Sequence, residues 1–277
     1  MIEADVPLAA RLRLAHAVVQ TLAAEAGVDL LHVKGAAASP AWYPPHSGSD
    51  VDVIVRPSHL PAMSRILAAH GWERRGDFED SSAWAHAATW WHDAWGCLDL
   101  HRSWPGLDGD PETAYDTLSR DHRWTVIAHH DCPTPRLAAE VLLLALHEGR
   151  SGPGRSSTGH LRATWSEAPP AFRDEVEALA RELGAEVGMA AGLGHLEEFR
   201  DHPDHDLWAY YASGDSNRWH EWRARLRWAG AHGQVRATLR RALRPTTPAG
   251  TPDHGLVAVQ LRRAWHLAHD LVDRRQR

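Results

Sequence analysis

Three aspartates in two apolar segments have the clearest chemical potential in this chain. Asp50 and Asp52 alternate with valine, and Asp99 has a leucine on either side. Successive side chains of a β-strand point to opposite faces, so Asp50 and Asp52 are expected to share one face. Neighbouring carboxylates raise each other's pKa, and a divalent cation between them relieves that repulsion. The pattern predicts a site for Mg²⁺ or Mn²⁺, completed by Asp99 if its strand lies alongside.

A second feature precedes these acids, where an apolar segment runs through Lys34 and Gly35 into a run of small residues. Lys34 is the only lysine of the chain, and the other 29 of its 30 basic residues are arginines. A compact ammonium kept in so arginine-rich a sequence suggests a specific role. A strand that turns through glycine into a helix can bring backbone N–H groups close to a phosphate.

The elements that must position these residues follow from hydrophobic periodicity. An apolar stripe predicts a helix over 7–26, and Gly71 ends a second helix over 58–70. Short apolar runs predict strands at 28–33, 50–56 and 96–101, and a hairpin is expected from 72–78 and 83–91. The fold class is therefore α+β, with a small mixed-sheet domain over residues 1–110.

Helical patterns dominate the remainder of the chain. They lie at 111–120, 136–149, 170–187, 217–243 and 255–275. The stretch 151–158 is expected to be a flexible loop, and 245–252 a turn rich in proline and threonine. We therefore expect residues 111–277 to form an all-helical second domain.

The motifs together resemble those of the nucleotidyltransferase superfamily. Its pattern is a glycine at a strand-to-helix turn, an Asp-x-Asp strand and a later third aspartate. Gly35 is followed by Ala36, and 13 further residues lead to Asp50. The chain is most similar to an uncharacterised bacterial nucleotidyltransferase-like family with Lys-Gly, Asp-x-Asp and Asp-Leu-His motifs.

The matching residues of that family, and two departures from its pattern, can be named in this chain. The matches are Lys34-Gly35, Asp50-Val51-Asp52, Asp99-Leu100-His101 and the helical segment from Glu140 to His147. Ala36 stands where the superfamily usually has serine or glycine, and His46 where the narrower family often has arginine.

The resemblance implies transfer of a nucleoside monophosphate, by analogy AMP from ATP, to a protein, peptide or small-molecule acceptor. Asp50, Asp52 and Asp99 would be catalytic and would hold Mg²⁺ or Mn²⁺. Lys34, Gly35 and Ser49 would contact the nucleotide, and His101 would contact the acceptor. The helical domain would bind that acceptor.

Two other interpretations of the Asp-x-Asp pattern stay open at this point. One is a glycosyltransferase that holds a sugar nucleotide through a metal ion. Residues 1–49 are short for the nucleotide-binding unit that normally precedes such a motif. The other is a non-catalytic nucleotide-binding or antitoxin-like module.

Composition limits the location and the partners of the protein. Two cysteines, Cys97 and Cys132, do not make a disulfide framework, and no apolar run is long enough for a membrane span. The beginning of the chain lacks the basic and apolar blocks of a signal peptide, so a cytoplasmic protein is expected. A net charge of −6 argues against a nucleic-acid-coating surface, although residues 218–277 are basic.

Three further patterns have ordinary explanations. Trp219, Trp222 and Leu226 have the spacing of a buried helical stripe, which we favour over a surface that stacks nucleic-acid bases. The acid- and histidine-rich segments 201–206 and 129–132 match no zinc-ligand spacing and are expected to be polar loops.

Overall fold

The computed structural model describes residues 6–44, 48–78, 86–154, 156–215, 217–233, 235, 236 and 238. Its first part contains helices and strands close to those predicted. These are α1 (Leu8–Glu25), β1 (Leu30–Val33), β2 (Asp50–Val55), α2 (Leu60–Ala69), β3 (Glu73–Arg74), β4 (Ala87–His92) and β5 (Gly96–His101).

The five strands form one mixed sheet in the order β1-β2-β5-β4-β3. Strands β2 and β5 are parallel, and the other neighbouring pairs are antiparallel. The pairing of Glu73 with Trp91 confirms the predicted association of the 72–78 and 83–91 segments. The α+β class and the mixed sheet are thus confirmed.

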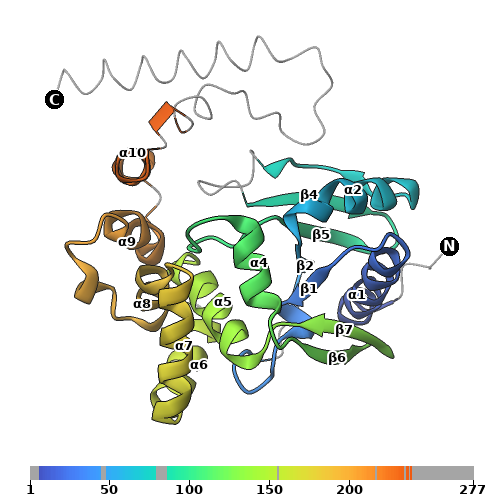
Figure 1. Cartoon of the computed structure of the whole chain (residues 1–277), viewed down its shortest axis with the longest axis horizontal. Helices are drawn as coiled ribbons and strands as arrows, with labels where there is room; N and C mark the ends of the chain where they lie inside the picture. Colours follow the sequence, from blue (N-terminus) through green and yellow to red (C-terminus); the bar gives the residue numbers. More distant parts are fainter. Residues whose placement is uncertain are drawn as a thin grey trace.

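The two faces of the sheet have different partners. Val51, Val53 and Val55 are buried against α1 and α2, together with Leu98 and Leu100. The alternating residues Asp50, Asp52 and Ile54 therefore point to the opposite face. There Ile54 joins the second core, which includes residues of α5. Figure 1 shows α1 on one side of the sheet and the later helices gathered on the other side.

The second half of the chain is mainly helical. Its helices are α4 (Pro111–Ser119), α5 (Leu137–Gly149), α6 (Ser156–Glu167), α7 (Pro170–Glu182), α8 (Glu186–Leu193), α9 (His205–Ser213) and α10 (Arg218–Ala231). The helix predicted over 170–187 is in fact two, α7 and α8. Gly184, with φ +61°, lies between them in a left-handed conformation that ends a helix.

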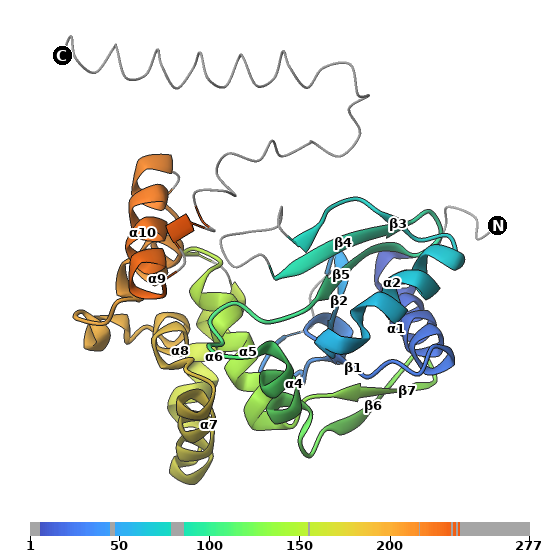
Figure 2. The same ribbon diagram turned by 45° about the horizontal axis from the view of Figure 1, so that its top comes forward.

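A β-hairpin interrupts this helical half, contrary to the all-helical expectation. It consists of β6 (Arg123–Ile127) and β7 (His130–Thr134), which pair antiparallel. The turn residues Ala128 and His129 both have positive φ, as in a tight two-residue turn. Such turns favour Asn-Gly, so this turn lacked its usual sequence signal. The hairpin contacts α1 and β1 (Figure 2).

Other predicted features of the helical half also change. Helix α6 occupies part of the expected 151–158 loop, and α9 begins inside the expected 201–206 loop. The prediction that Trp219, Trp222 and Leu226 form a buried stripe is wrong, because Trp219 is 59% exposed. Among its described residues, α10 buries the small residues Ala224 and Ala229 instead. The turn at 245–252 and the helix at 255–275 lie outside the described residues.

Cys97 and Cys132 are both free thiols. Among the described residues, every helix is too short or too polar to cross a bilayer.

A buried pair of histidines joins α1 to β1. The Nδ1 atoms of His16 and His32 lie 2.9 Å apart, and the Nε2 atom of His32 is 3.1 Å from Gln20. Burial lowers the pKa of His16 to about 4, and it lowers the pKa of His32 well below its usual range. Both rings are therefore neutral at pH 7, and one Nδ1 donates to the other.

These pKa shifts predict that acid destabilises the fold. An unfolded histidine binds a proton below pH 6.5, but folded His16 does so only near pH 4. The contribution of His16 to the free energy of unfolding is thus fully present above pH 6.5, and it is lost as the pH decreases. Between pH 7 and pH 5, His16 alone should remove about 2 kcal/mol from the free energy of unfolding.

Urea unfolding at several pH values measures this effect. The His16→Leu variant should lose that share of the pH dependence. The control His195→Gln, whose side chain is 58% exposed, should keep it. If the unfolding free energy of His16→Leu depends on pH as strongly as that of the parent, His16 is not the source of this pH dependence.

Candidate active site

The three predicted carboxylates meet on the sheet face opposite α1 and α2. Strand pairing places Asp52 directly beside Asp99, and Asp50 beside Cys97. Ligand atoms of Asp52, Asp99 and His101 lie within 4.8 Å of one another. The expectation that Asp99 lies alongside the Asp-x-Asp strand is confirmed.

Asp52 is the most enclosed of these acids, and both of its oxygens have partners. Its side chain is 6% exposed, with Lys34 Nζ 2.7 Å from Oδ2 and His101 Nε2 2.8 Å from Oδ1. Burial alone would raise the pKa of Asp52, but the Lys34 ammonium and the hydrogen bond from His101 outweigh it. The pKa of Asp52 is therefore well below its usual range, and the group is ionised.

The other two acids are partly buried and differ in their surroundings. Thr89 Oγ1 donates a 2.7 Å hydrogen bond to Asp99 Oδ1, from the register position directly opposite. Burial raises the pKa of Asp50, and the charge of Asp52 raises it further, although Lys34 opposes the change. An added cation would offset this repulsion at Asp50.

The backbone of the Lys34-Gly35 turn is unusual. Lys34 has φ 55° and ψ −168°, a region that non-glycine residues rarely occupy, and Gly35 follows with φ +45°. Such a conformation costs about 1–3 kcal/mol and persists where the surrounding structure enforces it. Here it directs the Lys34 ammonium to Asp52. Among the described residues, none apart from the two chain neighbours of Gly35 has an atom within 4 Å of a Cβ placed there, so this side of the turn is open.

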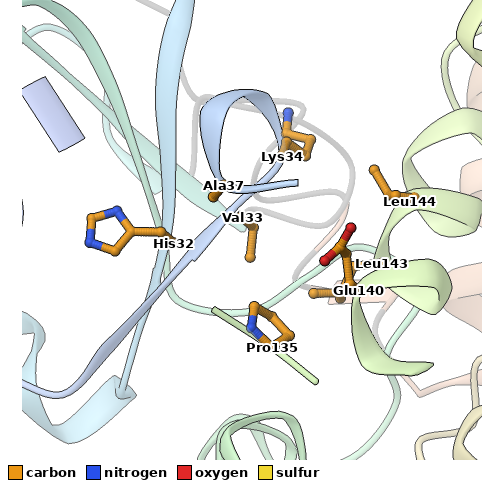
Figure 3. Close-up of a pocket in the computed structure, with 8 residues that line it drawn as sticks. All are labelled: His32, Val33, Lys34, Ala37, Pro135, Glu140, Leu143 and Leu144. Carbon is orange, nitrogen blue, oxygen red and sulfur yellow. The ribbon is translucent and has the colours of Figure 1, made fainter. Parts of the chain in front are cut away.

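A buried carboxylate of α5 supports that turn from the other side. Glu140 is 5% exposed, accepts a 2.6 Å hydrogen bond from the Ser39 amide and forms an ion pair with Arg123. Figure 3 shows Glu140 facing the pocket beside Val33 and Ala37, whereas the amino group of Lys34 points away from it. Glu140 therefore acts on the conformation of residues 35–39, and Lys34 remains available to Asp52.

Loss of this support should be measurable as a loss of stability. A Glu140→Ala variant leaves the Ser39 amide without its acceptor, which should cost about 1–3 kcal/mol of unfolding free energy. The matched control is Glu175→Ala, since Glu175 also pairs with an arginine but is 47% exposed. That change should cost less than about 1 kcal/mol in the same urea experiment. Equal losses would show that burial of Glu140 is unimportant.

The structure adds two residues to the site that the sequence did not indicate, the aromatic Trp104 and the cationic Arg150. Trp104 is 1% exposed and donates from Nε1 to the Leu143 carbonyl oxygen at 3.1 Å. Lys34 Nζ and Arg150 Cζ each lie 5.7 Å from the centre of its ring. Two cations therefore contact the same tryptophan ring, and one of them, Lys34, also pairs with Asp52. Arg150 lies directly after α5, but nothing in its local sequence distinguishes it from the other arginines.

Of three other residues that the sequence singled out, His101 is buried, Ser49 is exposed, and His46 is not among the described residues. His101 is 2% exposed and donates to Asp52, and its ring is tilted by 42° against that of Trp104, with 4.8 Å between the ring centres. Its contact with an acceptor stays a prediction. Ser49 lies directly before β2.

Comparison with known proteins identifies the family of this chain. Residues 9–201 match the family described as an uncharacterised nucleotidyltransferase. The chain belongs to this family. The match spans the sheet, the acidic site and helices α1 to α8, and the family description supports nucleotide transfer as the general activity. No curated protein matches the chain.

Solved structures give more distant likenesses. They include lincomycin-bound lincosamide adenylyltransferase LnuA, with 14% identity, TM-score 0.38 and coverage of 56% of this chain and 96% of that one. The antibiotic-resistance factor ANT(2'')-Ia shares 12% identity at a TM-score of 0.43, and the match covers 69% of this chain and 97% of that one. A nucleotidyltransferase-like protein from Paracoccidioides brasiliensis shares 13% identity at a TM-score of 0.38, and the match covers 73% of this chain and 94% of that one.

Proposed function

We propose that this nucleotidyltransferase transfers a nucleoside monophosphate, with AMP from ATP as the first candidate, to a hydroxyl or amino group of an acceptor. The observation that carries the proposal is the pairing of Asp52 with Asp99 beside the Lys34 ammonium. Group transfer at a phosphorus centre depends mainly on positioning and on charge neutralisation. The carboxylates of Asp50, Asp52 and Asp99 and the Lys34 ammonium would supply both.

The residues present fit a divalent metal ion. Oxygen donors of Asp52 and Asp99 lie within 4.8 Å of one another, and carboxylate oxygens are the ligands that Mg²⁺ and Mn²⁺ prefer. Asp50, Asp52 and Asp99 would hold the metal. When bound, it would neutralise the triphosphate and the charge that develops during transfer.

The chain's own side chains supply the remaining functions. Lys34, the Gly35 amide and Ser49 are proposed to bind the triphosphate, and Arg150 is proposed to add a second positive charge. Asp99 is proposed to accept the proton of the acceptor hydroxyl. The acceptor oxygen then forms a bond to the α-phosphorus as the bond to the departing pyrophosphate breaks. His101 is proposed to orient Asp52.

The acceptor site is proposed to lie in the helical half of the chain, within residues 111–277. Helix α5 contacts the segment after Gly35 through Glu140 near its start, and Arg150 directly after its end contacts Trp104, so both ends of this helix lie close to the active site. Small hydroxylated or amino-bearing molecules, peptides and proteins are the acceptor classes to test. A cytoplasmic location remains a prediction.

Nucleotide turnover tests the proposal directly. Purified full-length protein is incubated with Mg²⁺ or Mn²⁺, each of the four labelled NTPs and a panel of these acceptors. Pyrophosphate release and a mass gain of one nucleoside monophosphate on the acceptor are the expected results. Asp50→Asn and Asp99→Asn should abolish both.

Other outcomes would favour the alternatives. Release of a nucleoside diphosphate from a sugar nucleotide, without use of any NTP, would favour a glycosyltransferase. Metal-dependent NTP binding without turnover on any acceptor would favour a non-catalytic nucleotide-binding module.

A further inference from the structure

A second group of metal-ligand side chains lies outside the active site. It comprises Asp108 in the segment after Trp104, Asp204 directly before α9 and His232 directly after α10. Each offers one ligand atom, and the three atoms lie within 4.8 Å of one another. Figures 1 and 2 both show α9 and α10 side by side. Three segments that are distant in the sequence thus meet at this point.

Asp204 is the buried member of this group. It is 6% exposed, and its Oδ1 atom is shielded from solvent and accepts no hydrogen bond from the described residues. That oxygen instead lies 3.4 Å from Nε2 of His232. A buried carboxylate oxygen without a donor is costly unless a cation lies next to it.

The orientation of His232 shows what kind of cation is needed. Its Nδ1 atom lies 2.8 Å from the carbonyl oxygen of Trp228, and the two rings stack with centres 4.6 Å apart. A carbonyl only accepts, so Nδ1 carries the proton and donates. In the neutral ring, Nε2 then presents its lone pair to Asp204 Oδ1, and the two atoms repel each other. A metal ion between them removes this conflict, as does a second proton on the ring.

The geometry favours the metal ion. Histidine ligands of metals commonly donate their other N–H to a backbone carbonyl, as His232 does. Two ligands at about 2.0–2.1 Å from a tetrahedral zinc ion are about 3.4 Å apart, which matches the separation of His232 Nε2 and Asp204 Oδ1. Imidazole with carboxylates is a donor set that suits zinc better than magnesium.

We propose that Asp108, Asp204 and His232 form a zinc site that fastens α10 to the body of the protein. Asp108 is exposed, which leaves the fourth ligand position to water. The Asp108 amide donates to the Leu183 carbonyl oxygen at 2.9 Å, so the segment that carries this ligand is anchored. The site is separate from the carboxylates at the active site and needs none of them.

Zinc binding by the full chain tests the proposal. Protein treated with EDTA and then dialysed is titrated with zinc chloride by calorimetry, and its melting temperature is recorded with and without zinc. We expect one zinc ion at this site and a higher melting temperature. His232→Gln and Asp204→Asn should weaken that binding at least about 100-fold and abolish the zinc-dependent rise.

Matched variants separate this site from the rest of the chain. His220→Gln changes an exposed histidine of α10, and Asp201→Asn changes an exposed aspartate near Asp204. Both should bind zinc as the parent does. Asp52→Asn removes an active-site ligand and should also keep the zinc-dependent rise.

Two results would overturn the zinc site. The first is equal zinc binding by His232→Gln and His220→Gln. The second is the absence of any zinc-dependent rise in the parent protein, which would leave a protonated His232 paired with Asp204. If His232→Gln does not fold, Asp108→Asn serves instead, because its exposed side chain can be changed without a cavity.

Discussion

An Asp52→Asn variant is expected to fold normally and to lose at least about 10³-fold in kcat, because several kcal/mol of charge stabilisation depend on this carboxylate. Asparagine has the same shape, and its Oδ1 atom can still accept from Lys34. Its NH2 group then faces His101 Nε2, which accepts in the other neutral tautomer. Asparagine lacks the negative charge that holds a divalent cation. Steady-state pyrophosphate release measures kcat, and urea unfolding measures stability.

The control for this variant is Asp93→Asn. Asp93 is an exposed aspartate in the turn between β4 and β5, and it accepts a 3.0 Å hydrogen bond from Trp91 Nε1. Its replacement should leave kcat unchanged. Retention of full activity by Asp52→Asn would remove the metal-binding role from Asp52.

The second large effect concerns Lys34. A Lys34→Arg variant should lose about 10²-fold in kcat/KM for the NTP, although the positive charge is kept. The ammonium lies 2.7 Å from Asp52 Oδ2 in a site that leaves the lysine side chain 14% exposed. A planar guanidinium is larger and needs a different geometry, so it would displace either Asp52 or the triphosphate. Lys34→Met should lose more, because it also removes the charge.

The reverse exchange at a remote site is the control for this prediction. Arg56 forms ion pairs with Asp29, Glu112 and Asp116 and lies directly after β2, at the opposite end of this strand from Asp50. Arg56→Lys should reduce stability slightly and leave kcat/KM unchanged. Equal kcat/KM values for Lys34→Arg and the parent would show that any positive charge suffices at position 34.

Several parts of the fold and site follow from local sequence. The alternation in Asp50-Val51-Asp52 defines one acidic and one apolar face, because side chains of a strand alternate. Gly35 indicates a turn, and the continuous apolar run in α5 indicates a buried helix. These features depend on backbone sterics and on the burial of neighbouring side chains. They were therefore predictable from residue types and spacing.

Other parts depend on contacts between distant segments. The β6–β7 hairpin was missed because Ala128 and His129 replace the usual turn residues, and its pairing is stabilised by contact with α1 and β1. Trp104 and Arg150 become part of the site only because α5 packs against the sheet. No local pattern indicates that partnership.

Residue types and spacing alone identify the side chains that could do the chemistry: two aspartates on one strand face, a third between leucines, and a single lysine before a glycine. Only the folded chain shows their register, with Asp52 beside Asp99, and the buried contacts of Asp52 with Lys34 and His101. Folding also brings Asp108, Asp204 and His232 together. The physical reason is that strand and helix periodicity arises from short-range sterics. Register and long-range contacts arise instead from the packing of whole elements around a common core.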